Sequence, residues 1–465
     1  MRKSPKEPFP GVARFFRFRE NETDYRTEFG AGVTTFLTLA YIIFVQPAIL
    51  SGRMFGFETG MDFNAVMVAT CLAGAAATLI MGLWANYPIA QAPGMGENFF
   101  FVFTVIPAAA ALIAARGWTD TSPWQVALGV VFISGVLFLL LSLLKVRRAL
   151  IDSVSPSLKN GIAVGIGLFI AFIGLQNAKV VVANPGTLVM LTDTILNADI
   201  LVFGVGLLVM AVLTVRKVRG AIIIGIVAGL LAALLLGKVS YSGILSSPPP
   251  LSPTLLKMDV SRALAFQLWP YIIIFLFMDV FDTMGTLIGV AEQAGFIKDN
   301  RLPRAGRALL SDAVGTVAGA AMGTSTVTSF IESSAGVAHG GRTGLTAVVT
   351  AGGFIFALFF SPLVAMVADY PPITAPALVV VGAMMIRNVV KIDWSDFTEC
   401  FPAFLVIIGI PLSYSIADGI AWSFIAYPLI KLLSGRGREA GWITYLVGGL
   451  FLLRYLLPYL ESLPG

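Results

Sequence analysis

The chain has 465 residues, of which 57% are hydrophobic and 12% are charged, about half the charged fraction of a typical soluble domain. A soluble protein of this length has no interior large enough to hide that much apolar surface, whereas each membrane-spanning helix uses about 20 apolar residues. The composition therefore excludes a soluble enzyme or binding module. It predicts an all-α polytopic membrane protein whose function lies inside the membrane part.

Residues 1–26 form a basic N-terminal segment with seven Lys or Arg and no cleavable apolar run. Three arginines alternate with three phenylalanines between positions 14 and 19. Such an amphipathic pattern is typical of a segment that lies on the membrane surface, and we expect it on the cytoplasmic side.

Fourteen apolar stretches follow, which we interpret as membrane spans: 27–50, 63–86, 93–114, 123–144, 157–176, 199–215, 219–237, 264–292, 308–322, 324–338, 343–368, 374–390, 397–415 and 418–434. With the N-terminus in the cytoplasm, 24 Lys and Arg fall on the inner side and six on the outer side. This positive-inside asymmetry predicts a multi-pass protein of the plasma membrane, the inner membrane in a bacterium. An apolar tail at 441–459, which holds Arg454, is either an interfacial helix or a fifteenth span, and we favour the interface.

The spans divide into two groups of seven, 27–237 and 264–434, with an extracytoplasmic loop at 238–263 and a C-terminal interfacial tail at 435–465. Because seven is odd, the second group must be inverted relative to the first. Spans 3 and 10 both begin with a small or β-prone stretch that ends in a carboxylate, and inverted repeats with matching breaks are typical of secondary transporters. The alternative is that Gly and Pro are simply common in membrane helices.

The two breaks lie at Gln91–Asn98, which holds Pro93, Gly94 and Gly96, and at Gly323–Ser329, which is rich in Thr and Ser. Both compositions favour extended backbone over helix. We expect a short strand in each break, since extended backbone at membrane depth must be buried or line a cavity. Its N–H and C=O groups, with the helix N-termini that follow, can then bind a planar polar ligand.

Four carboxylates stand out inside apolar segments: Glu97, Asp279, Asp282 and Glu332. A charge at the bilayer centre costs at least about 2.5 kcal/mol, so such residues are typically functional. Asp279 and Asp282 are three positions apart and share one helix face. Gly285, four residues before a second glycine, predicts a close approach of another helix to that face.

Glu332 directly follows the Thr/Ser run, where a buried carboxyl group favours its neutral form and can carry a proton through a transport cycle. Asn98 has an amide donor and acceptor suited to a purine edge, and Phe330 can stack on a ring. The alternative for each acid is a helix cap or a carboxyl pair. Two further acids, Glu97 and Asp418, fit either interpretation.

No enzyme is indicated, because the sequence has no Ser/His/Asp order, HExxH or Walker A pattern. Cys71 and Cys400 lie in apolar runs, and His339 is the only histidine. These counts offer no disulfide framework and no multi-histidine metal site, so we expect no metal and no cofactor. Lys and Arg fall in loops between spans, which argues against a nucleic-acid partner.

Three motifs together resemble the azaguanine-type purine permeases of the nucleobase–ascorbate transporter superfamily: Gln91–Gly96 with Asn98, Asp279–Leu287, and Gly323–Ser329 with Ile331–Val337. The resemblance runs in order over nearly the whole chain. It implies fourteen spans in two inverted seven-span repeats, arranged as core and gate domains, with short strands in spans 3 and 10. It also implies a purine site between those strands and span 8, with the base taken up together with protons.

On this resemblance the substrate site comprises Gly94, Met95, Asn98, Asp279, Asp282, Thr328, Ser329, Phe330 and Glu332. Proton coupling falls to Asp282 and Glu332, with Asp279. The acidic Glu97 and the bulky Phe99–Phe101 run depart from the family pattern and leave the preferred purine open.

We therefore expect a secondary active transporter that imports adenine, guanine or hypoxanthine by proton symport. A homodimer is common in the superfamily. The alternatives are an anion exchanger of the same fold and a channel. Glu332 disfavours an anion exchanger, which carries a positive residue near span 10, and a channel needs no titratable carboxyl pair.

Overall fold

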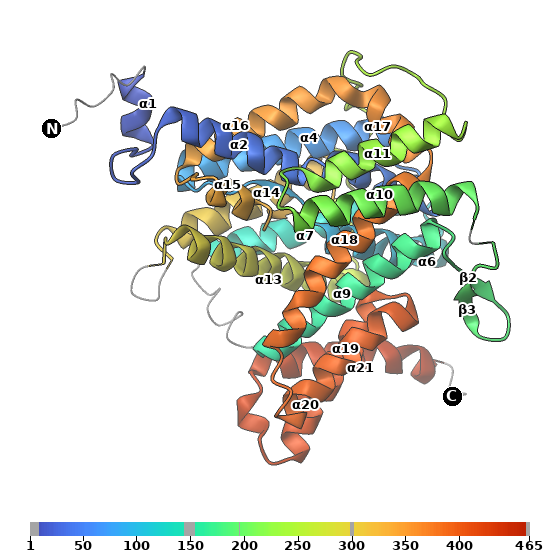
Figure 1. Ribbon diagram of the computed structural model, residues 1–465. Helices are drawn as coiled ribbons and strands as arrows, with labels where there is room; N and C mark the ends of the chain where they lie inside the picture. The colour runs from blue at the N-terminus through green and yellow to red at the C-terminus, as the bar shows by residue number, and fades with distance from the viewer. Residues whose placement is uncertain (1–8, 144–153, 195, 298–301, 462–465) are drawn as a thin grey trace.

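The computed structural model describes residues 9–143, 154–194, 196–297 and 302–461. They form a bundle of helices that run at varied tilts to one another (Figure 1). Among the described residues, nine helices are long and apolar enough to cross a membrane, and three shorter apolar helices accompany them. This confirms the predicted helical polytopic architecture, whereas the number fourteen stays a prediction.

The helices and strands follow in this order: α1 (Pro10–Phe15), α2 (Tyr25–Leu39), α3 (Ile42–Leu50), α4 (Phe63–Ile80), β1 (Gln91–Pro93), α5 (Met95–Phe100), α6 (Ile106–Arg116), α7 (Pro123–Leu143), α9 (Pro156–Asn177), β2 (Val181–Asn184), β3 (Leu188–Leu191), α10 (Ala198–Val215), α11 (Ala221–Leu235), α12 (Val260–Ala263), α13 (Trp269–Ala294), α14 (Ala305–Met322), β4 (Val327–Ser329), α15 (Ser333–Ala338), α16 (Gly344–Ala357), α17 (Ser361–Ala368), α18 (Ala375–Ile386), α19 (Phe397–Ser413), α20 (Ile416–Leu433) and α21 (Trp442–Glu461).

Two parts of the chain depart from the expected run of helical spans. The stretch 324–338 is no continuous helix: it holds β4 and the six-residue α15. The loop after α9 carries a hairpin of β2 and β3, paired from Val181↔Leu191 to Asn184↔Leu188, so the fold is not purely helical. Asn184 builds that turn by accepting hydrogen bonds from the N–H groups of residues 186 and 187 at 2.7 and 3.0 Å.

Some of the charges used to orient the chain lie outside the described residues: Lys145, Arg147, Arg148, Lys298 and Arg301, together with residues 1–8 of the N-terminal segment and 462–465 of the tail. The cytoplasmic N-terminus and the inner-membrane location therefore stay predictions.

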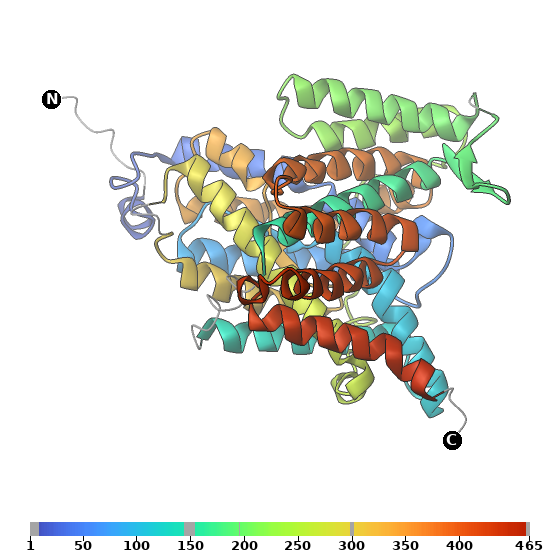
Figure 2. The ribbon, with the colours of Figure 1, turned by 90° about the horizontal axis from the view of Figure 1, so that it is seen from below.

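Glycines let α9 and α18 approach closely. A Cβ atom on Gly167 would meet the Gly382 carbonyl oxygen at 2.9 Å and the Met385 Cβ at 2.7 Å. In Figure 1 these two helices lie side by side. Figure 2 shows α10 and α11 packed together at one edge of the molecule, with α21 toward the opposite edge. The close contacts of small residues suit a membrane bundle, where packing rather than water drives association.

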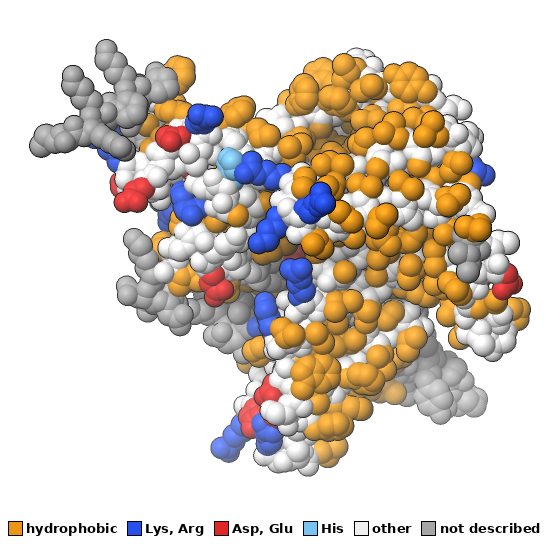
Figure 3. All heavy atoms as spheres, in the orientation of Figure 1, with side chains coloured by type: hydrophobic (Ala, Val, Ile, Leu, Met, Phe, Trp, Pro, Cys, Tyr) orange, Lys and Arg blue, Asp and Glu red, His pale blue; other side chains and the backbone are white. Residues whose placement is uncertain are grey.

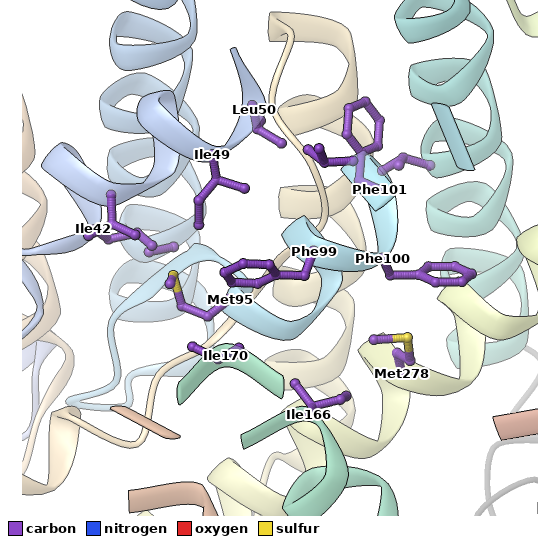
Figure 4. Packing of buried hydrophobic residues seen from close by; sticks show 14 of the residues in the cluster. Ile42, Ile49, Leu50, Met95, Phe99, Phe100, Phe101, Ile166, Ile170 and Met278 are labelled. Atoms are coloured by element: carbon purple, nitrogen blue, oxygen red, sulfur yellow. The ribbon is translucent and has the colours of Figure 1, made fainter. Parts of the chain in front are cut away.

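The three phenylalanines after Asn98 belong to the protein interior. Phe99, Phe100 and Phe101 are each fully buried, and Figure 4 shows their rings pointing in three different directions. The Phe100 ring meets Phe275 of α13 edge-on at a centroid distance of 4.8 Å. These rings therefore hold α5 against its neighbours, and none of them is free to stack on a substrate.

The two ends of the described chain pack onto the bundle. Phe16 and Phe18 are buried against Tyr25 and Leu345, while Phe15 is 59% exposed. Only one of these three phenylalanines therefore faces outward. The apolar surface that this segment can offer to a membrane is smaller than the sequence pattern predicted. At the other end, α21 packs on α20 through a buried face of Ile443, Val447 and Phe451, and this contact leaves open whether the tail lies at the interface.

Candidate functional site

Two short strands bring the two breaks together. β1 and β4 pair antiparallel, with Gln91 opposite Ser329 and Pro93 opposite Val327. The Gly94 N–H extends the pairing by donating to the Thr326 carbonyl at 3.0 Å. All six strand residues are buried, and the backbone satisfies its hydrogen bonds within the protein, as a break at membrane depth requires. The starts of α5 and α15 thereby lie on either side of one small sheet.

A buried carboxylate of α14 ties this sheet to α13. Asp312 is fully buried. Its Oδ1 accepts hydrogen bonds from Gln91 at 2.8 Å and Ser329 at 3.1 Å, and its Oδ2 accepts one from Thr283 at 2.6 Å. The Thr283 hydroxyl also lies 2.8 Å from that of Thr328. Asp312 thus holds β1, β4 and α13 in one network, which such a buried charge needs in order to be stable.

Asp279 is the second carboxylate of this interior. It is fully buried, and its Oδ2 accepts a hydrogen bond from Thr316 at 2.8 Å. Its Oδ1 has no hydrogen-bond partner among the described residues. A buried acceptor without a donor is costly, and protonation of the Asp279 carboxyl group would lower this cost.

The predicted shared face of Asp279 and Asp282 is split. Asp279 and Thr283 point into the network, whereas Asp282 and Gly285 are exposed. A Cβ on Gly285 would have open space around it. The expectation of a close approach by another helix was therefore wrong at Gly285, whereas a Cβ on the second glycine of the pair, Gly289, would meet Ile331 Cδ1 at 3.3 Å.

Asp282 and Glu332 lie on neighbouring elements, because α13 contacts both β4 and α15, and Glu332 directly precedes α15. Asp282 directly precedes Thr283, whose hydroxyl lies 2.8 Å from that of Thr328 in β4. Tyr41 joins α2 to α3. Tyr41 itself is buried and donates a hydrogen bond to Glu332 Oε1 at 3.0 Å. Glu332 and Tyr41 thus meet just after the end of β4, and Asp282 lies on the helix that packs against this strand.

Glu332 also lines a recess of about 380 Å³, a volume typical of small-molecule sites. The recess runs between α2, α15 and the turn that joins α10 to α11, and its lining includes Thr34, Thr38, Lys217, Arg219 and Met384. It gives Glu332 a route to the surface.

Asn98 lies beside the sheet with its amide already paired. Its side chain is fully buried and forms a two-way amide pair with Gln46 of α3, in which Gln46 Nε2 donates to Asn98 Oδ1 at 3.0 Å. Ser325 donates to the same oxygen. Binding a substrate through Asn98 therefore requires exchange with Gln46.

The chain is similar to known permeases over most of its length. A family profile described as Permease family matches residues 26–421. A putative permease of Methanocaldococcus jannaschii is 46% identical over 96% of this chain and 98% of its own. The guanine/hypoxanthine permease PbuG of Bacillus subtilis is 44% identical over 95% and 99%, and the adenine permease AdeQ of Escherichia coli is 42% identical over 96% of each chain.

The chain belongs to the nucleobase–ascorbate transporter family. It is a transporter and not an enzyme. Among solved structures, the permease resembles the transmembrane domain of the cyanobacterial bicarbonate transporter BicA, with a TM-score of 0.60 at 16% identity over 87% of this chain and 98% of that one. It also resembles the murine Slc26a9 anion transporter in the inward-facing state, with a TM-score of 0.60 at 11% identity over 93% and 73%. These likenesses show that the chain shares its overall fold with these two transporters.

The remaining predicted residues fall into two groups. Gly94, Met95, Thr328, Ser329 and Phe330 lie buried in or beside the sheet of the permease. Glu97 is also buried there, at 3% exposure. Asp418 lies apart from them: in the first turn of α20 its Oδ1 accepts a hydrogen bond from Tyr455 of α21 at 2.6 Å, which ties the last two helices together.

Sequence reasoning missed several members of the permease's buried network, among them Gln46, Asp312, Tyr41 and Thr316. Gln46 could have been identified from the sequence, because it is a polar residue inside an apolar run, beside Pro47. Asp312 lies only four residues after the start of the predicted span 308–322. An acid so close to the end of a span is expected at the membrane interface. The helix α14 begins earlier, at Ala305, and carries Asp312 into the interior. In the described parts of the chain, no group of His, Cys, Asp and Glu is arranged to hold a metal ion.

Proposed function

We propose that this permease imports purine nucleobases, namely adenine, guanine or hypoxanthine, by proton symport. The observation that carries the proposal is the hydrogen bond from Tyr41 to Glu332 just after β4, beside the helix α13 that carries the exposed Asp282. Relatives that match over 95% or more of this chain are named adenine and guanine/hypoxanthine permeases. A neutral heterocycle with ring N–H donors is what such carboxylates would bind.

The substrate would lie between the β1–β4 sheet and α13. The carboxyl groups of Asp282 and Glu332 would accept ring N–H groups, and the Thr328 hydroxyl would bind the ring edge. Phe330, buried at 6% exposure beside them, would close the site on its apolar side. Met95 and Gly94 would flank the base at the start of α5, and Asn98 would contribute after release from Gln46.

Proton coupling would follow from the cost of a charge at membrane depth. With Glu332 and Asp282 both ionised, two negative charges would lie on neighbouring elements. A proton on one of them removes the repulsion and supplies a donor for an acceptor nitrogen of the purine. The pair Asp279 and Asp312 would hold a second proton in the interior, so Asp279 would act through the network and not by contact with the base.

We further propose that the two predicted seven-span groups, 27–237 and 264–434, are inverted repeats that form core and gate domains. The β1–β4 sheet with α13 would belong to the core, and α9, α18, α10 and α11 to the gate. Movement of core against gate would open the site to each side in turn. A dimer through the gate remains part of this proposal, as does a cytoplasmic N-terminus.

An anion exchanger is the second candidate, because BicA and Slc26a9 share the fold. The side chains around the sheet oppose it: the polar centre holds Asp279, Asp282, Asp312 and Glu332, and an anion there would be repelled. A channel is disfavoured by the closed, hydrogen-bonded interior of the described residues, which offers a site and not a pore.

Uptake of labelled adenine, guanine and hypoxanthine in a bacterial strain that lacks its own permeases tests the proposal. We expect saturable uptake of at least one purine, displaced by unlabelled purines but not by uracil. Collapse of accumulation by a protonophore would support symport. Absence of uptake of all three bases by a well-expressed protein, or uptake of bicarbonate instead, would refute it.

A further inference from the structure

The recess that Glu332 lines also has a basic part, formed by the α10–α11 turn, which we call its basic end. The turn between α10 and α11 contributes Lys217, Arg219 and Gly220 to its wall. Lys217 and Gly220 adopt left-handed backbone angles, with φ of 56° and 69°, which makes the turn tight and fixes where its side chains start. Figure 3 shows Lys and Arg side chains gathered in this part of the surface, beside a large hydrophobic face.

The start of α11 adds further positive potential to that end. Ala221 and Ile222 line the recess with the first turn of this 15-residue helix. Its N-cap is Gly220, without a side-chain cap, and no acidic residue lies in the first turn. The first N–H groups of a helix carry partial positive charge and bind anions. The helix start supplements the two cations and would not make a site alone.

His339 completes this end, because it lines the same recess. Burial and the charge of Arg219 lower the pKa of His339 below its ordinary value. The imidazole is therefore neutral at pH 7 and leaves Lys217 and Arg219 as the two full positive charges. It offers a hydrogen bond in place of a charge.

The lining of one recess thus includes the Glu332 carboxyl group and an anion-binding arrangement from the α10–α11 turn. A neutral purine needs only the carboxyl group. A molecule that joins a purine to a phosphate through a sugar would use both the carboxyl group and the cations, and 380 Å³ lies in the range of pockets for such ligands. Arg and Lys bind phosphate strongly because the ion pair is charge-assisted.

We propose that the recess binds purine nucleoside monophosphates, with the base at Glu332 and the phosphate at Lys217 and Arg219. This inference rests on the proposed function, since it assumes that the Glu332 end accepts a purine. A bound nucleotide would wedge between α2 and the α10–α11 turn and hold the transporter in one state. Nucleotides made from the imported base would then inhibit further import.

The competing explanation is that Lys217 and Arg219 only orient the chain in the membrane, as loop cations do. Arg216 distinguishes nucleotide binding from a role in membrane orientation. It is exposed in the same turn but does not line the recess. A role in orientation makes all three cations equivalent, whereas nucleotide binding involves only Lys217 and Arg219.

The test measures binding to the purified full chain in detergent, where both faces are accessible. Labelled hypoxanthine or guanine is displaced by inosine or guanosine monophosphate, by the matching nucleoside, and by inorganic phosphate. We expect the monophosphate to displace the base about tenfold better than the nucleoside, as one or two charge-assisted hydrogen bonds would provide. This advantage should vanish in the K217Q/R219Q double variant and persist in R216Q.

The outcomes separate the two proposals. If the wild-type chain binds no purine base at all, the proposed function fails and this inference falls with it. If the base binds but the monophosphate has no advantage, or keeps it in K217Q/R219Q, the nucleotide site is refuted while the proposed function stands. A repeat with phosphatidylglycerol in the micelles distinguishes a lipid: loss of the monophosphate's advantage on addition of this lipid would assign the basic end to a lipid headgroup and overturn the proposal.

Discussion

Tyr41 donates a hydrogen bond to Glu332 Oε1 at 3.0 Å, across 291 positions of the sequence. The contact joins the break between α2 and α3 to the end of β4. Tyr41 and Glu332 stand directly before α3 and α15, so the hydrogen bond connects the starts of two helices.

Replacing Glu332 by Gln should abolish concentrative uptake. The amide cannot take up or release a proton, so accumulation above the external concentration should be lost while expression and membrane insertion stay normal. Tyr41→Phe is the milder change, because it removes one hydrogen bond, worth about 1 kcal/mol, and leaves the carboxyl group. Accumulation of a labelled purine in cells measures both. Normal accumulation by the Glu332→Gln protein would rule out its coupling role.

The two interior carboxylates should respond in opposite ways to conversion into amides. In Asp279→Asn the new N–H₂ group can donate to Asp312, and Oδ1 of Asp279 has no donor to lose among the described residues. We expect this variant to be as stable as the wild type or more stable. In Asp312→Asn the amide can replace only part of three accepted hydrogen bonds, which should cost roughly 2–4 kcal/mol.

Thermal unfolding of the two purified variants measures this contrast. A large loss of stability for Asp279→Asn, with little for Asp312→Asn, would contradict the proposed shared proton.

A side chain at Gly94 should damage the centre of the protein. A Cβ atom there would collide with the Glu97 carboxylate and approach Thr328 Cγ2 at 3.1 Å. Gly94→Ala should therefore lower purine uptake strongly, and Glu97→Ala in addition should restore part of it by removing the colliding atoms. Gly352→Ala is the matched control, since its Cβ would have open space. Equal uptake by Gly94→Ala and Gly352→Ala would show that the close approach has no functional role.

An ion-pair cluster at the end of α20 predicts a pH dependence of stability. Lys431 is 1% exposed and contacts Glu399 and Glu439 at 2.9 and 2.8 Å. Hydrogen bonds from Arg436 and then Lys431 lower the pKa of Glu439 from 4.5 to about 2. A carboxyl group whose pKa is lowered by folding stabilises the protein above its ordinary pKa, and this stability is lost as the pH falls through the lowered value.

The melting temperature of wild type should therefore exceed that of Glu439→Gln at pH 7, and the difference should shrink as the pH falls from about 4.5 toward 2. Glu58→Gln, at an exposed acid, should match wild type throughout. A difference that stays constant over this pH range would exclude the ion pairs as its cause.

The sequence predicted the features that stand out against an apolar background. Gly and Pro at 93–96 and the Thr/Ser run before Ser329 marked the two breaks, and the structure pairs them in one sheet. Asp279, Asp282 and Glu332 were visible as charges inside apolar runs. Partners across the chain were not predictable, because periodicity along one helix does not say which distant residue lies opposite. The Gln46–Asn98 amide pair and the Tyr41–Glu332 bond are of this kind.

The rotation of α13 about its own axis was also not predictable from the sequence. Spacing put Asp279 and Asp282 on one face, but the neighbours of α13 divide that face into a buried part and an open part. Only the position of α14, with Asp312 and Thr316 against Asp279 and Thr283, decides which acid is buried.

The most direct test of the central claim is purine uptake into proteoliposomes with an imposed proton gradient. The account predicts that a more acidic exterior drives hypoxanthine, guanine or adenine above its external concentration in wild type, and that Glu332→Gln only equilibrates the base. Equal accumulation with and without the gradient, or gradient-driven accumulation by Glu332→Gln, would contradict proton coupling at this carboxyl group.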